Sequence, residues 1–186
     1  MKMINILNVL NFEYIIVGVI VAIIYMIWSL GIKPSKRKKE IKLLLEEIVG
    51  SYNYKVSSRS EKGSKYDFVL DSTGDSKYKQ ILIKTIEVPK VNTITINSKN
   101  TWNLHYGGTA EPGRGFPYNR FLDELKPFLN IKVEDDVLKL VIVYKSTLKI
   151  QRYLNESELQ ILKYSDKVYD YKIITFGDLK AHFEDL

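Results

Sequence analysis

The sequence predicts an α/β domain in which helices flank a mixed β-sheet, and it predicts a single transmembrane helix in front of that domain. Three observations carry this prediction. An apolar stretch free of charge occupies residues 14–32, several runs of alternating or continuously apolar residues follow, and helical patterns lie between those runs. With 186 residues, the chain has room for one domain with an ordinary hydrophobic core.

The apolar stretch reads YIIVGVIVAIIYMIWSLGI from Tyr14 to Ile32 and contains no charged residue. About 20 apolar residues are needed to cross about 30 Å of hydrocarbon, which makes this stretch a candidate for a membrane span. Tyr14 and Trp28 stand near its two ends, as aromatic residues do at membrane interfaces. The alternative is a buried core helix, but helices of soluble proteins usually keep a polar face. We therefore expect a transmembrane helix at 14–32.

A basic segment follows this stretch directly. Residues 33–42 hold six basic residues and one acidic residue, whereas residues 1–13 hold only Lys2 and Glu13. Positive charge on the C-terminal flank predicts a short N-terminus outside the cell membrane, at residues 1–13, and a cytoplasmic domain at residues 43–186. Residues 33–42 are then a juxtamembrane linker that attracts anionic lipid head groups of the bilayer.

The predicted elements of the domain follow in order. An amphipathic helix carries Ile41, Leu44, Leu45 and Ile48 at helical spacing and ends near Gly50. Strands are expected at 52–57, at 66–71 and 80–86 as a hairpin, at 91–97, at 137–145 and at 167–175. Helices are expected at 118–126, after an N-cap at Asn155 or Ser157, and at 177–186. Residues 103–119 hold four of the ten glycines, which predicts a long loop.

Composition excludes some kinds of site. The chain has no cysteine, so a disulfide scaffold, a thiolate metal site and a cysteine nucleophile are all excluded. The net charge is +6, and the linker accounts for most of it. Residues 52–120 hold eleven basic and six acidic side chains, which predicts a modest basic face.

The hairpin combines residues suited to phosphodiester hydrolysis. Asp67 begins its first strand, and Lys84 closes its second strand. A metal nuclease of this design needs two carboxylates for Mg²⁺ and a lysine that stabilises charge and helps to activate water. The second carboxylate is expected two residues before the lysine, where this chain has Leu82.

This arrangement resembles the PD-(D/E)XK nuclease superfamily and, more narrowly, the nuclease-related domain family known as NERD. The resemblance covers most of residues 38–185. It rests on Asp67, Lys84, acidic residues at Glu46 and Glu47 on the first helix, and Trp102 downstream of the lysine. The segment PYNRFLDELKPFL, residues 117–129, is similar to the helix entry of that family, with Phe116 and Arg120 in place of its Asn and Gln.

The resemblance implies a restriction-endonuclease-like fold and a catalytic set of Asp67, Lys84 and Glu47, with Asp67 holding the metal. Leu82 departs from this pattern, since it removes one ligand and puts hydrocarbon against the ion. Gln80 or Asp71 could supply an oxygen from the same strands. The alternative for Asp67 and Lys84 is a cross-strand ion pair at the rim of the sheet.

Aromatic and basic residues interleave further along the chain. Bases could stack on Trp102, and phosphates could contact the nearby cations of Lys99, His105, Arg114 and Arg120. The alternative is a long loop that one tryptophan pins to the domain.

The functional hypothesis is a membrane-anchored cytoplasmic domain, catalytically inactive, that binds or interacts at the inner membrane face, with DNA or RNA as a candidate partner. It needs no cofactor. One alternative is an active nuclease that uses Mg²⁺ in a rearranged metal site. The second alternative is an adaptor at the membrane that contacts protein.

Overall fold

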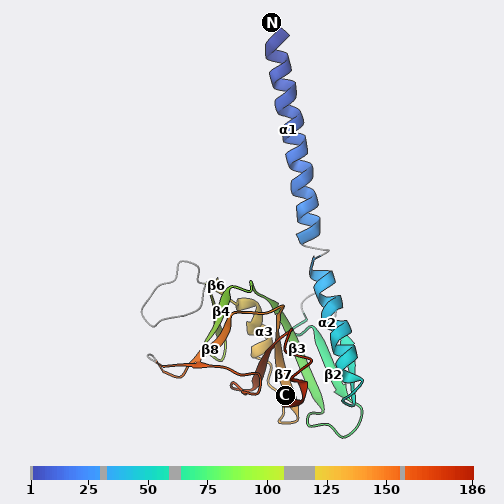
Figure 1. Ribbon diagram of the computed structural model, residues 1–186, viewed down its shortest axis with the longest axis vertical. Helices are drawn as coiled ribbons and strands as arrows, with labels where there is room; N and C mark the ends of the chain where they lie inside the picture. The colour runs from blue at the N-terminus through green and yellow to red at the C-terminus, as the bar shows by residue number, and fades with distance from the viewer. Residues whose placement is uncertain (1, 30–32, 59–63, 107–119, 156–157) are drawn as a thin grey trace. The chain divides into compact units, whose positions relative to one another are not determined.

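The computed structural model describes residues 2–29, 33–58, 64–106, 120–155 and 158–186 (Figure 1). At residues 2–13, 33–34 and 106, the description covers the backbone alone. The chain divides into two compact units, Met1–Ile41 and Lys42–Leu186. The first unit consists of helix α1 (Lys2–Ile27) and the beginning of helix α2 (Lys33–Val49).

The prediction of a transmembrane helix at 14–32 is wrong. Within the described ranges, no helix combines the length and the apolar character needed to cross a membrane. α1 ends at Ile27, within the predicted span of 14–32. The last predicted residues, 30–32, lie outside the described residues.

Two five-stranded sheets form the framework of the second unit, where the sequence predicts one. The first sheet has the order β1-β2-β3-β7-β10. Neighbours are antiparallel up to β3, and β3, β7 and β10 run parallel. Its strands are β1 (Tyr54–Ser58), β2 (Phe68–Ser72), β3 (Gln80–Glu87), β7 (Val137–Tyr144) and β10 (Tyr171–Thr175).

The second sheet has the order β6-β5-β4-β8-β9, in which only β4 and β8 pair in parallel. β5 occupies part of the predicted loop at 103–119, and β9 replaces the predicted helix after Asn155. The strands are β4 (Asn92–Ser98), β5 (Thr101–Tyr106), β6 (Arg120–Phe121), β8 (Lys149–Tyr153) and β9 (Leu159–Ile161).

The two sheets are connected at a corner. The β3–β7 pair ends where the backbone N–H of Val88 bonds the carbonyl of Tyr144, at 3.3 Å. Pro89 follows and has no N–H with which to extend the ladder. The segments that follow β3 and β7 then turn, and β4 pairs with β8 in the second sheet. The same two segments therefore build the centre of both sheets.

The main core lies between the sheets. It combines apolar side chains of the first sheet, of the second sheet and of the short helix α3 (Lys126–Leu129), among them Leu82, Val141, Ile94, Trp102 and Phe128. A 3₁₀ turn at Asp123–Leu125 precedes α3, and a second one, η3, spans Phe183–Asp185. The predicted helix at 177–186 is therefore present only as turns and one 3₁₀ segment.

Candidate functional site

The predicted nuclease residues Asp67 and Lys84 lie side by side. The backbone N–H of Asp67 donates to the carbonyl of Ile83, at 2.8 Å, which continues the pairing of β2 with β3. Lys84 Nζ stands 3.7 Å from Asp67 Oδ2. This same oxygen accepts hydrogen bonds from the backbone N–H and the hydroxyl of Thr85, each at 2.9 Å. Asp67 Oδ2 thus accepts two hydrogen bonds and makes one ion-pair contact, and a metal ion at this oxygen would compete with them.

Leu82 fills the place of the expected second carboxylate with hydrocarbon. Its side chain is 5 % exposed and belongs to the core between the sheets. Across the hairpin it faces Val69, and on β7 it faces Lys139 in backbone register. An ion at this position would lose its hydration without gaining a ligand. The structure therefore gives an apolar plug where the nuclease pattern needs an acid.

The other candidate metal ligands near the hairpin already have side-chain partners. Gln80 Nε2 donates to Asp71 Oδ1 at 2.7 Å, so the two candidate substitutes bond each other. Asp71 lies four residues along β2 from Asp67, which corresponds to about 13 Å. The carboxylate of Glu47, the predicted helix acid, pairs with Lys180 at 2.6 Å. Within the described part of the chain, no group of three or more His, Asp and Glu side chains is placed to hold a metal ion.

The residues predicted to contact nucleic acid do not form one surface. Trp102 is 1 % exposed in the core, and its Nε1–H donates to the hydroxyl of Tyr171 at 3.2 Å. His105 is also buried, and burial lowers the pKa of its imidazole. Arg120 is exposed but pairs with Glu124 at 2.5 Å. Lys99 is engaged by Asp170, and Arg114 lies outside the described residues.

Sequence reasoning missed a buried ionic cluster next to Trp102. Lys139, in the middle of β7, is fully buried, and its Nζ lies 2.8 Å from Asp170 Oδ2. It also donates to the carbonyls of Leu129 and Ile131 at 2.7 and 2.9 Å, and so holds the end of α3. Lys99 Nζ reaches the same Asp170 oxygen at 2.9 Å. The signal in the sequence is one lysine inside an otherwise apolar strand, VLKLVIVY.

Burial and charge act in opposite directions within this cluster. Burial lowers the pKa of Lys139, and the hydrogen bond from Lys139 to Asp170 counteracts part of this effect. For Asp170, burial raises the pKa, but the hydrogen bonds and charges of Lys139 and Lys99 together outweigh it and leave the pKa below its usual value. Since Lys139 is inaccessible to any ligand, the cluster is an anchor between β7, β10 and α3.

The lowered pKa of Asp170 predicts a dependence of stability on acid. A carboxyl group whose pKa is lower in the folded state stabilises the fold above its unfolded pKa, and this contribution is lost as the pH falls through the folded pKa. We expect Asp170→Asn to make the loss of stability below about pH 4 shallower. Urea unfolding at several pH values checks this, with Asp135→Asn, at an exposed carboxylate, as the control. Equal acid dependence in wild type and Asp170→Asn would contradict the role of the cluster.

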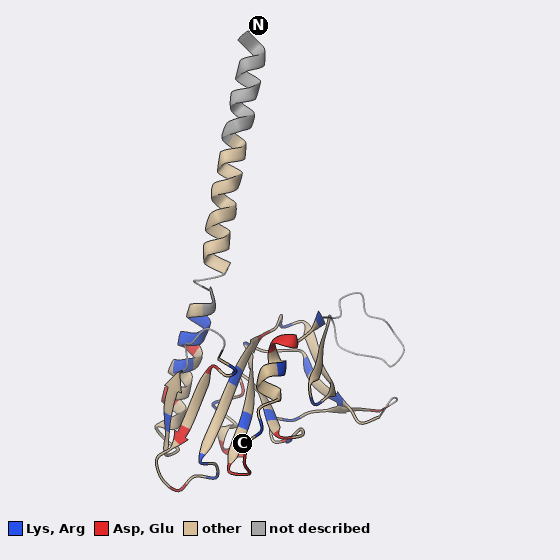
Figure 2. Cartoon of the chain, turned by 180° about the vertical axis from the view of Figure 1, so that it is seen from behind, with Lys and Arg blue, Asp and Glu red and all other residues tan. Residues whose placement is uncertain are grey.

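A cluster of positive charge lies on α2. Residues 33–42 carry six basic side chains and one acidic side chain, and Figure 2 shows the blue residues along the N-terminal half of this helix. Lys36 and Lys39 are exposed, and Lys42 pairs with Glu46 at 3.3 Å. The exposed lysines can contact phosphate groups without breaking a packed structure.

The fold and the hairpin define a mixed α/β domain of two sheets with an apolar plug in its candidate site. The chain matches no protein-family model, no curated protein and no solved structure.

Proposed function

We propose that the chain is a catalytically inactive, nuclease-like domain that binds nucleic acid through the basic residues of α2. The proposed inactivity rests on Leu82, which is buried in the core at the position where a metal ligand would be needed. A domain of this kind retains the charge that attracts a polyanion but lacks the oxygen ligands that bring Mg²⁺ to the scissile phosphate.

The basic residues of α2 support binding to phosphates. Lys36 and Lys39 are three residues apart on a helix, so they lie on the same side of it. Each phosphate contact made by such a lysine releases condensed counterions, which gives affinity without sequence preference. DNA and RNA are both partners of this chemistry, and single strands allow additional contacts to bases.

The test is one incubation with two readouts. The full chain is mixed with labelled single-stranded DNA or RNA, with and without Mg²⁺ or Mn²⁺, and both complex formation and strand length are measured. We expect a complex that weakens steeply with added salt, and intact strands under every metal condition. Metal-dependent cleavage that Lys84→Ala abolishes would show that the chain is an active nuclease instead.

Two double variants test whether α2 is the binding surface. Lys36→Gln with Lys39→Gln is expected to reduce the slope of log K against log salt by about 1 to 2, because each lost phosphate contact contributes nearly one unit. Lys90→Gln with Lys163→Gln removes the same charge at exposed positions in the second unit and should leave the slope unchanged. An unchanged slope in the first pair, or binding to anionic lipid vesicles but not to nucleic acid, would contradict the proposal.

A further inference from the structure

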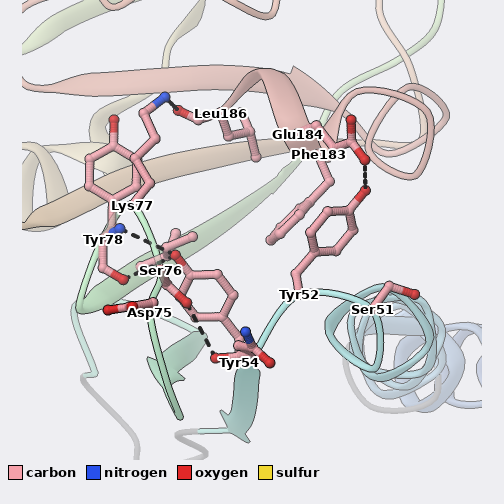
Figure 3. Close-up of a pocket in the computed structure, with 12 residues that line it drawn as sticks. Ser51, Tyr52, Tyr54, Asp75, Ser76, Lys77, Tyr78, Phe183, Glu184 and Leu186 are labelled. Atoms are coloured by element: carbon pink, nitrogen blue, oxygen red, sulfur yellow. Dashed lines mark hydrogen bonds between the residues drawn. The ribbon is translucent and has the colours of Figure 1, made fainter.

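A pocket of about 280 Å³ lies at the end of the first sheet opposite the Pro89 corner. Three segments far apart in the sequence form it: the chain that enters β1, the loop between β2 and β3, and the last residues of the chain (Figure 3). Ile81, Phe183 and Leu186 are buried and make its floor. Its size is close to that of pockets that take small ligands.

Four aromatic rings line this pocket, which we name the tyrosine pocket: Tyr52, Tyr54, Tyr78 and Phe183. The ring of Phe183 is tilted by 46° to Tyr52, with centroids 5.1 Å apart, and meets Tyr54 edge to face at 6.2 Å. Neither pair is stacked face to face. The face of an aromatic ring carries negative charge density and attracts cations.

The hydroxyl groups of Tyr52 and Tyr54 already have partners. Tyr52 donates to Glu184 Oε1 at 2.8 Å. Tyr54 donates to the carbonyl of Tyr78 at 3.0 Å and accepts from the N–H of Tyr78 at 3.4 Å. These two hydroxyls are therefore engaged, and the aromatic part of the pocket offers a cation its ring faces rather than hydrogen bonds. A cation that donates no hydrogen bond is better suited.

The charges at the rim favour a cation. The exposed carboxylates of Asp75 and Glu184 stand at the pocket with a single lysine, Lys77. The ammonium of Lys77 lies 5.3 Å from the centroid of the Tyr78 ring and donates to the carbonyl of Leu186 at 2.8 Å. One ring of the pocket thus already carries a cation, and the remaining rim charge is negative.

We propose that the tyrosine pocket binds a small organic cation with a methylated, quaternary ammonium group. Such a group presents an apolar shell to the aromatic rings, delivers its charge to the ring faces and the two carboxylates, and asks for no hydrogen bond. This site is independent of nucleic-acid binding, because no basic residue of α2 lines the pocket.

The test compares two ligands of the same shape. The full chain is titrated by calorimetry with choline and with 3,3-dimethylbutan-1-ol, in which a carbon atom replaces the nitrogen and removes the charge. We expect saturable binding of choline, and affinity for the neutral alcohol lower by at least about fivefold. Equal affinity for the two would overturn the proposal, as would the lack of saturable choline binding.

Matched variants place the ligand in the pocket. Tyr52→Leu removes a ring other than the one over which Lys77 lies and should weaken choline binding by about fivefold, whereas Tyr52→Phe keeps the ring and should retain choline binding. Glu184→Gln keeps an acceptor for Tyr52 but removes a charge, so choline should bind more weakly and the neutral alcohol should not change. Wild-type choline affinity in Tyr52→Leu and Glu184→Gln would overturn the proposal.

Discussion

Leu82→Glu is expected to destabilise the second unit by about 3 to 5 kcal/mol, although it restores the acid of the nuclease pattern. The side chain at this position is 5 % exposed, and Val69 faces it across the hairpin. A carboxylate there would lose its hydration among apolar neighbours, and the neighbouring cation on β7, Lys139, already pairs with Asp170. Urea unfolding of the full chain measures the effect.

The control for this prediction is Leu82→Met, which keeps the volume and the apolar character and should cost less than about 1.5 kcal/mol. A second measurement adds Mg²⁺ to the Leu82→Glu protein. Wild-type stability of Leu82→Glu, or stability that rises with Mg²⁺ in this variant alone, would mean that the position is open to an ion and that the hairpin holds a metal site.

Lys139→Met should destabilise the second unit by about 2 to 4 kcal/mol. Lys139 is fully buried and satisfies two backbone carbonyls and Asp170 at once, so its removal leaves buried acceptors without their donor. Lys99→Met is the matched control, because Lys99 binds the same carboxylate oxygen but is 44 % exposed, and it should cost at most about 1 kcal/mol. Equal costs for the two variants in urea unfolding would contradict an anchoring role for Lys139.

The first sheet was largely predictable from the sequence, because its strands show the periodicity that a buried strand requires. The hairpin of β2 and β3 and the apolar strand β7 lie where the apolar runs predict them. The second sheet was not predicted as a separate sheet, although its strand β4 lies at the strand predicted for 91–97. β5 lies at the start of a stretch rich in glycine, and β9 follows Asn155, whose capping pattern predicts a helix that pairing with β8 overrides.

The candidate site was predictable in part. The sequence predicts that Asp67 and Lys84 lie together, with Leu82 at the position of the expected acid, because side chains alternate along two adjacent strands. The burial of Trp102 and the cluster around Lys139 were not predictable, because both depend on contacts between segments far apart in the chain. The transmembrane prediction was wrong: it ran to residue 32, whereas α1 ends at Ile27, and none of the helices in the described part of the chain has both the length and the apolar character of a membrane span.

The corner at Pro89 has a consequence for how the domain folds. Residue 80 pairs with residue 137 in the first sheet, and residue 93 pairs with residue 149 in the second, so both central ladders require chain segments that are distant in sequence to meet. Such non-local pairing slows folding. Because the same two segments supply both ladders, we expect one encounter to start both sheets, so that the second unit gains and loses its structure in a single cooperative step.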